Sequence, residues 1–325
     1  MVDFRYHVVS IVAVFLALTV GLVLGTTTLN GGVVHDLNGR VTTLISDKES
    51  LQNSYDAANA TLDDTDAVLQ RLGGPLVAGK LTGRTVTLVT VPDADTATVS
   101  GVASVLRAAG ATVAYQVSLA RSFLAATPAT SLQGLVDRFA PPGSEPQRQD
   151  TPAARAAAVL GAALVGAPAA APGLTAGDVL QAFAGAKLVD GTGERPGDLL
   201  VLVADSPPTQ GETDARNPMA VALVAAAAKA GAGAVAVGPV TAAGRGGLLA
   251  ALRAQAGSIG ASTVDGADRV AGQITIVYAL QGELLGKSGQ YGSGPGNQGA
   301  LPGSVPNAPD PLPTGGASAA PVPVR

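Results

Sequence analysis

Three aspartates are the residues of this chain best placed to do chemistry. Asp93 and Asp95 follow a predicted strand, and Asp205 follows a second one. Ligands of α/β proteins bind outside the carboxyl ends of parallel strands, where carboxylates can hold a hard cation such as Mg²⁺ or Ca²⁺. The alternative is that these aspartates cap the helices that follow, a position Asp often occupies. We favour capping and assign no metal ligand here.

The remaining inventory for catalysis and metal binding is small. The sequence has no cysteine, and its two histidines, His7 and His35, flank an apolar N-terminal run rather than lying in the later part of the chain. A Ser-His-Asp arrangement therefore has no base there. Of the two methionines only Met219 lies in the later part, although copper sites use Cys, Met and His. We assign no catalytic or cofactor-binding residue and do not expect an enzyme.

One glycine-rich stretch matches a dinucleotide-binding pattern by letter. Residues 294–299 read GPGNQG, which fits G-x-G-x-x-G. The pattern binds a pyrophosphate only where a strand precedes it and a helix follows. We predict neither element there, so we interpret the match as accidental.

Residues 80–287 are predicted to form an α/β domain. Two β-α-β units of Val- and Leu-rich strands favour a Rossmann-like parallel sheet with helices on both faces. The predicted strands are 85–91, 112–117, 199–203, 234–237 and 262–264, and the predicted helices are 96–109, 131–139, 152–165, 176–183, 218–230 and 267–285.

Residues 288–325 are predicted to be a disordered tail. Their composition is dominated by Gly, Pro, Ser and Asn, which gives too little apolar surface to offset the entropy lost on ordering. The net charge of the whole chain is −4, and no basic cluster indicates a nucleic-acid partner.

Residues 1–30 are predicted to be a transmembrane anchor. Val8–Gly25 is almost wholly apolar, and no charged residue lies between Arg5 and Asp36. Such a stretch is long enough to cross a bilayer as a helix. The alternative, a cleaved signal peptide, fits less well because the run exceeds a typical h-region. Gly21 and Gly25 form a small-xxx-small pair that could let two helices approach.

The short head before the apolar run predicts the orientation of this single-pass protein. The basic residues on the two sides of the run are nearly balanced. A seven-residue head is easily left in the cytoplasm, so we expect the C-terminal domain on the extracytoplasmic side of the cell membrane.

Residues 31–73 are predicted to be a coiled-coil stalk that begins after Gly31-Gly32 and ends at Gly73-Gly74-Pro75. Apolar residues recur at alternating spacings of three and four, a heptad pattern that favours self-association into an oligomer. The alternative is one amphipathic helix packed on the globular domain. Asp63, Asp64 and Asp66 are interpreted as part of a solvated face. The apolar seam contains Val34, Leu37, Val41, Leu44, Leu51, Tyr55, Ala58, Leu62, Leu69 and Leu72, interrupted by Lys48 and Thr65.

The start of the chain resembles an actinobacterial family named for mycobacterial copper transport protein B (MctB). The resemblance rests on residues 1–18, MVDFRYHVVSIVAVFLAL, and continues in GLVLG at 21–25. The segments STVD at 262–265 and GQYG at 289–292 are also similar to the family's closing pattern. The resemblance covers residues 1–292.

The resemblance implies copper homeostasis, with copper ions as the transported species and an outer layer of the envelope as the location. Relatives known as SteB imply a different role, in which a coiled-coil scaffold acts with a membrane partner to control cell-wall hydrolysis and cell separation. The residues fit copper poorly, since no ligand motif carries over. A single apolar helix also favours the inner membrane over an outer-membrane barrel.

Overall fold

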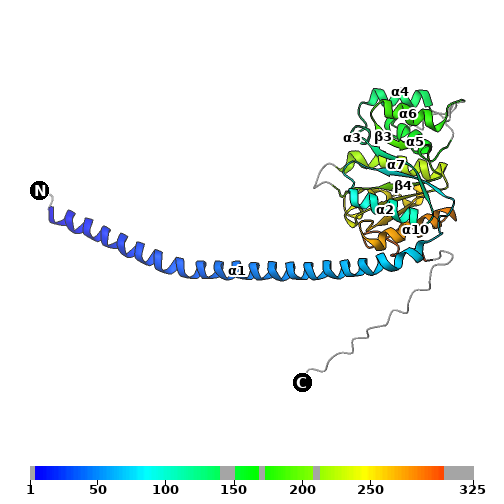
Figure 1. Ribbon diagram of the computed structural model, residues 1–325. Helices are drawn as coiled ribbons and strands as arrows, with labels where there is room; N and C mark the ends of the chain where they lie inside the picture. Colours follow the sequence, from blue (N-terminus) through cyan, green and yellow to red (C-terminus); the bar gives the residue numbers. More distant parts are fainter. Residues whose placement is uncertain (1–3, 140–150, 168–172, 208–212, 304–325) are drawn as a thin grey trace, which may run out of the picture. The chain divides into compact units, whose positions relative to one another are not determined.

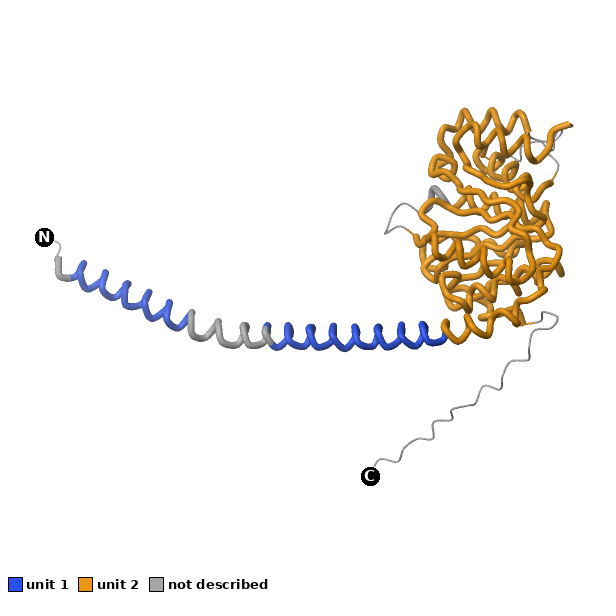
Figure 2. The backbone as a smooth tube through the Cα atoms, in the orientation of Figure 1, with its two compact units in different colours: residues 1–65 blue, residues 66–325 orange. Residues whose placement is uncertain are grey.

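The structure is a computed structural model that describes residues 4–139, 151–167, 173–207 and 213–303. Within these ranges, the side chains at 4–5, 26–36, 38 and 213–216 are not described. The chain divides into two compact units, Met1–Thr65 and Asp66–Arg325, which Figure 2 shows in different colours. We call them unit 1 and unit 2.

One helix, α1, extends from Phe4 to Val77. It includes the apolar run and the predicted stalk, and it continues through Gly31-Gly32, where the sequence predicts the boundary between anchor and stalk. Glycine in a helix interior costs only about 1 kcal/mol relative to alanine, which a long helix tolerates.

The predicted end of the stalk at Gly73-Gly74-Pro75 is also too early, because Pro75 lies inside the last turns of α1. A proline so near the C-terminal end removes one hydrogen bond without preventing the few residues that follow from remaining helical. Gly73 has a packing role instead. A Cβ at this position would lie 3.0 Å from Cδ1 of Ile274, so glycine allows α1 to approach helix α10 (Val270–Leu284) closely.

Unit 2 is built on a seven-stranded sheet in the order β3-β2-β1-β4-β5-β6-β7. Figure 1 shows this sheet with helices on both sides. All neighbouring pairs are parallel except β2 and β3, which are antiparallel. The mixed α/β class and the mostly parallel sheet are therefore confirmed. The strands are β1 (Thr85–Thr90), β2 (Thr112–Leu119), β3 (Val189–Gly193), β4 (Leu199–Val203), β5 (Gly233–Gly238), β6 (Ser262–Asp265) and β7 (Gln290–Tyr291).

Alternating side chains of the central strands divide the core into two layers. On β4, Leu199, Val201 and Val203 pack against α2 (Thr96–Ala108) and α10. Leu200 and Leu202 point to the opposite face, where α4 (Ala129–Phe139), α5 (Pro152–Leu164) and α7 (Thr213–Ala230) lie. The second face also holds the remaining short helices, α3 (Arg121–Leu124), α6 (Ala176–Gly185), η1 (Val240–Ala243), α8 (Leu248–Arg253) and α9 (Ala256–Ile259). Both faces of the sheet are thus covered, which explains why its strands are continuously apolar.

Residues 288–303 are ordered, which corrects the predicted boundary of the tail. Gln290 and Tyr291 form β7 at the edge of the sheet and are 4% and 9% exposed. Hydrogen bonds to buried polar groups of unit 2, rather than apolar burial, hold this glycine-rich segment. Residues 304–325, the rest of the predicted tail, lie outside the described residues.

The last turns of α1 belong to unit 2 and pack on α10. Asp66 accepts hydrogen bonds from the backbone N–H of Val270, at 3.1 Å, and from Arg269, at 3.3 Å. Leu69 packs against the buried core, and the Tyr278 hydroxyl donates to the Leu76 carbonyl at 3.1 Å. Asp66 therefore serves a structural purpose and is not part of a solvated face.

We predict that Asp66→Ala destabilises unit 2 by about 1–2 kcal/mol. The substitution removes the acceptor for the first N–H of α10 and the ion-pair partner of Arg269. Chemical denaturation of the full chain in detergent, followed by the circular dichroism of unit 2, measures the change. Asp64→Ala, at an exposed position two residues earlier, is the matched control and should change stability by less than about 0.5 kcal/mol. Equal effects of the two substitutions would contradict the role given to Asp66.

Candidate functional site

The aspartates after β1 do not gather around a common cation position. Asp95 is the N-cap of α2, and its carboxylate accepts hydrogen bonds from the backbone N–H of Thr98, at 2.8 Å, and from the Thr98 hydroxyl, at 2.9 Å. These bonds hold the pKa of Asp95 below its usual value. The predicted capping role is confirmed for this residue.

Asp93 has a different role from the predicted cap. It adopts a left-handed backbone conformation, with φ of 69°, and its carboxylate pairs with Arg121 at 2.5 Å. Both side chains are more than half exposed, so the pair contributes little to stability. The helix after β4, α7, begins at Thr213, too far along the chain for Asp205 to be its N-cap.

A cavity of about 360 Å³ opens beside Asp93, at the carboxyl ends of β1 and β2. The Thr90 and Ser118 hydroxyls, 3.0 Å apart, form part of its polar lining together with Gln116 and Thr96. The cavity lies at the edge of the sheet where parallel strands usually bind ligands, but it lies between β1 and β2, whereas the strand order reverses between β1 and β4. Across the described residues, no three His, Cys, Asp or Glu side chains are grouped so that they could hold a metal ion.

Met219, the one thioether of unit 2, is 3% exposed. It lines a second cavity of about 370 Å³ whose other walls include Leu132, Ala129 and Pro152. The sequence contains no cysteine, and both histidines precede unit 2. Met219 therefore has no second soft ligand in unit 2, and a single thioether is a weak site for Cu(I).

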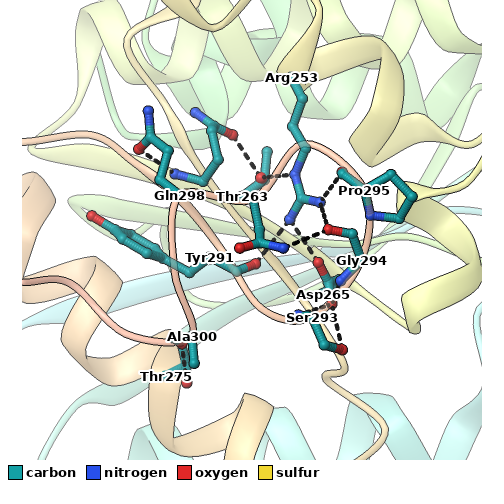
Figure 3. A network of polar contacts seen from close by, with 12 residues as sticks. Arg253, Thr263, Asp265, Thr275, Tyr291, Ser293, Gly294, Pro295, Gln298 and Ala300 are labelled. Atoms are coloured by element: carbon teal, nitrogen blue, oxygen red, sulfur yellow. Dashed lines mark hydrogen bonds and ion pairs between the residues drawn. The ribbon is translucent and has the colours of Figure 1, made fainter.

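A buried ion pair that sequence reasoning missed holds the C-terminal segment in place (Figure 3). Arg253 ends α8, and its guanidinium lies 2.7 Å from the carboxylate of Asp265 at the end of β6. The two side chains are 5% and 0% exposed. The guanidinium also donates to the carbonyls of Tyr291, at 2.8 Å, and Pro295, at 2.7 Å.

The other oxygen of Asp265 is satisfied by the same segment. It accepts hydrogen bonds from the backbone N–H groups of Ser293, at 2.8 Å, and Gly294, at 2.9 Å. Most hydrogen-bonding positions of Arg253 and Asp265 are thus occupied by other groups of the chain. We therefore interpret the pair as structural and not as a ligand-binding site. We call Arg253, Asp265 and residues 290–295 the C-terminal clamp.

The clamp also explains the glycine-rich pattern at 294–299. A strand, β7, does precede it, contrary to the prediction. Gly292 has a φ of 120°, and a Cβ on Gly294 would lie 2.8 Å from the side chain of Ala243. These glycines are needed because the loop turns sharply and lies close to buried Asp265. The sequence contained one signal for this arrangement, the segments STVD and GQYG. In the structure they form the neighbouring strands β6 and β7, which pair in parallel.

Glu283 is a second buried acid beside this sheet edge. Its side chain on α10 accepts a hydrogen bond from the Ser262 hydroxyl on β6, and Ser262 in turn accepts from the backbone N–H of Gly289 at 3.0 Å. Burial raises the pKa of Glu283 to about 7, although the bonds from Ser262 act in the opposite direction. Its charge therefore changes close to neutral pH.

Unit 1 exposes two apolar surfaces. Tyr6–Gly25 is long and apolar enough to cross a membrane, and none of it is buried. Farther along α1, the seam residues with described side chains also remain uncovered; Leu44, Leu51 and Leu62 are 66%, 72% and 49% exposed. Val34, the first predicted seam residue, lies outside the described side chains. Leu69 differs because it belongs to unit 2 and packs against the core of that unit.

Comparison with known proteins decides the family. A family model described as "Copper transport outer membrane protein, MctB" matches residues 1–302. The match includes helix α1, the α/β unit and the C-terminal clamp. This chain belongs to the MctB family. The resemblance seen in the N-terminal residues is therefore confirmed.

Curated relatives agree with the family model. Copper transporter MctB of Mycobacterium tuberculosis (strain H37Rv) is 31% identical over 307 residues, which cover 91% of this chain and 98% of the relative. The protein of the same name from Mycobacterium leprae is 30% identical over 317 residues, with the same shares covered.

We predict that Arg253→Ala destabilises this MctB-family chain by about 3–5 kcal/mol, because it leaves the buried carboxylate of Asp265 without its counter-charge. Denaturant unfolding measures the loss, and hydrogen exchange should show faster exchange at Gly294. Arg84→Ala is the control: Arg84 pairs with Asp198 at 3.1 Å, but its side chain is 44% exposed. A loss below about 1 kcal/mol is expected there. Similar losses for both would contradict the clamp.

We also predict that the stability of unit 2 falls as the pH rises from about 5 to about 7. Folding raises the pKa of Glu283 from 4.5 to about 7, so the folded state binds the proton more tightly and loses this advantage as the group ionises. The contribution is on the order of 3 kcal/mol. Unfolding curves of the wild type and Glu283→Gln across this range test it. A variant with the same pH slope as the wild type would contradict the assignment.

Proposed function

We propose that this protein is a membrane-anchored envelope protein that takes part in copper transport. The observation that carries the proposal is the family match over residues 1–302, which covers the apolar helix and the α/β unit together. Relatives that cover 91% of the chain bear the name copper transporter. Copper ions are then the transported species, not a resident cofactor.

The small number of soft copper ligands in unit 2 supports the proposal that several copies of the chain act together. Unit 2 offers Met219 as its one thioether and has neither histidine nor cysteine. One buried thioether cannot provide a chain of copper sites. We infer that several copies associate through unit 1, and that copper leaves the cell along the assembly or through a protein that the assembly engages.

The proposed topology follows from the apolar helix. We infer that Tyr6–Gly25 crosses the cell membrane once, with the few residues before it in the cytoplasm and the α/β unit on the extracytoplasmic side. The family description names the outer membrane. An apolar helix is typical of the inner membrane, and we keep that placement in the proposal.

The exposed seam on unit 1 favours a second candidate function. Seam residues such as Leu44 and Leu51 are more than 60% exposed, and exposed apolar surface at heptad spacing marks a helix that pairs with another. In this alternative the chain is a scaffold: it pairs with itself and with another envelope protein, and it controls cell separation and cell-wall hydrolysis.

Deleting the gene in its host and measuring cell copper beside septum separation distinguishes the two functions. The copper proposal predicts that the deletion strain contains more copper than the wild type, and that expression of the full chain returns the copper content to the wild-type level. The variant Leu51→Glu, which places a charge in the seam, should fail to restore the wild-type copper content, whereas Asn53→Glu, on the outward side of the helix, should restore it. Normal copper with unseparated cells would overturn the copper proposal and support the scaffold.

A further inference from the structure

Two neighbouring charges on the stalk have no partner within their own helix. The side chains of Asp47 and Lys48 are exposed, and across the described residues no ion pair or side-chain hydrogen bond involves either of them. Residues adjacent in sequence do not face each other on a helix, while residues three and four apart do. The neighbours at those spacings are Thr43, Leu44, Ile45, Ser50, Leu51 and Gln52, none of which is charged.

The heptad pattern gives these charges distinct places in a coiled coil. Counting from Val34 at position a, the alternating spacings put Lys48 at a and Leu51 at d, and Asp47 falls at g. In a parallel two-stranded coiled coil, an a side chain inserts between residues of the partner helix that include the g residue just before the facing a position. Lys48 of one copy would then lie beside Asp47 of the other.

The apolar helix limits how two copies can pair. Tyr6–Gly25 and the stalk are parts of the same helix, α1. Two copies whose apolar helices cross the same bilayer in the same direction have stalks that run in the same direction and start at the same depth. A lysine at an a position weakens a seam but selects one register. The anchor and the lysine therefore favour the same arrangement, parallel and in register.

We propose that residues 37–62 form a parallel, in-register homodimer in which Lys48 of each copy pairs with Asp47 of the other. The occupant of the exposed seam is thus a second copy of this chain, because the charges are self-complementary across the two-fold axis. The proposal rests on the self-association in the proposed function and adds its direction, its register and the residues that fix them.

Single cysteines test the register directly, because the natural sequence has none. The full chain in native membranes is oxidised and analysed for covalent dimers. Leu51→Cys, at d, should form a disulfide with itself, since only thiols that come close with the right geometry can bond. Asn53→Cys, on the outward face, is the matched control and should form no covalent dimer. Equal cross-linking of the two variants, or none in Leu51→Cys, would overturn the proposal.

Charge exchange tests the Lys48–Asp47 pair. In the Leu51→Cys background, Lys48→Glu should weaken dimerisation on the order of tenfold, because two attractions become two repulsions. Asp47→Lys combined with Lys48→Glu should restore it. Failure of the double exchange to restore cross-linking would overturn the pair.

The native mass separates the possible failures. A dimer without the Leu51→Cys cross-link would overturn the parallel register while leaving self-association standing. A monomer would overturn both, together with the association through unit 1 inferred above, whereas the copper level of the deletion strain is a separate measurement that tests copper transport itself.

Discussion

The contact between the last turns of α1 and α10 is the constraint on which the rest of unit 2 depends. The helix that carries the apolar span ends inside the globular fold, where Asp66 binds the first turn of α10 and Gly73 allows close packing on Ile274. α10 in turn packs under β5 and β6 and places Glu283 beside Ser262. Loss of the contact would affect both the core layer around α2 and the edge that the C-terminal clamp closes.

Periodicity predicted most of the fold, and it failed where polar contacts replace apolar burial. The apolar strands and the alanine-rich helices were predictable because their side chains repeat with the period of the element they form. β3 and β7 were not predictable, because VDGTG and QY have too few apolar residues to signal a strand. Pairing with β2 and with β6 orders them, and such long-range pairing leaves no local pattern.

The candidate site shows the same limit. Asp95 was predictable as a cap because capping depends on residues three positions apart. The Arg253–Asp265 pair joins residues on two elements, and its glycine loop looks like a flexible tail until the buried carboxylate is known. The stalk is the opposite case. Its apolar spacing was visible in the sequence and the large apolar side chains between Leu37 and Leu62 are exposed in the structure, so their partner is a proposal supported by Lys48 and Asp47.

We propose that this MctB-family chain acts as a membrane-anchored oligomer that does not hold copper in its own α/β unit. Native mass spectrometry of the full chain released from detergent, with and without Cu(I), tests this claim most directly. We expect masses of two or more 31.8 kDa chains, without one bound copper ion per chain. A single-chain mass that carries one tightly bound copper ion would contradict it.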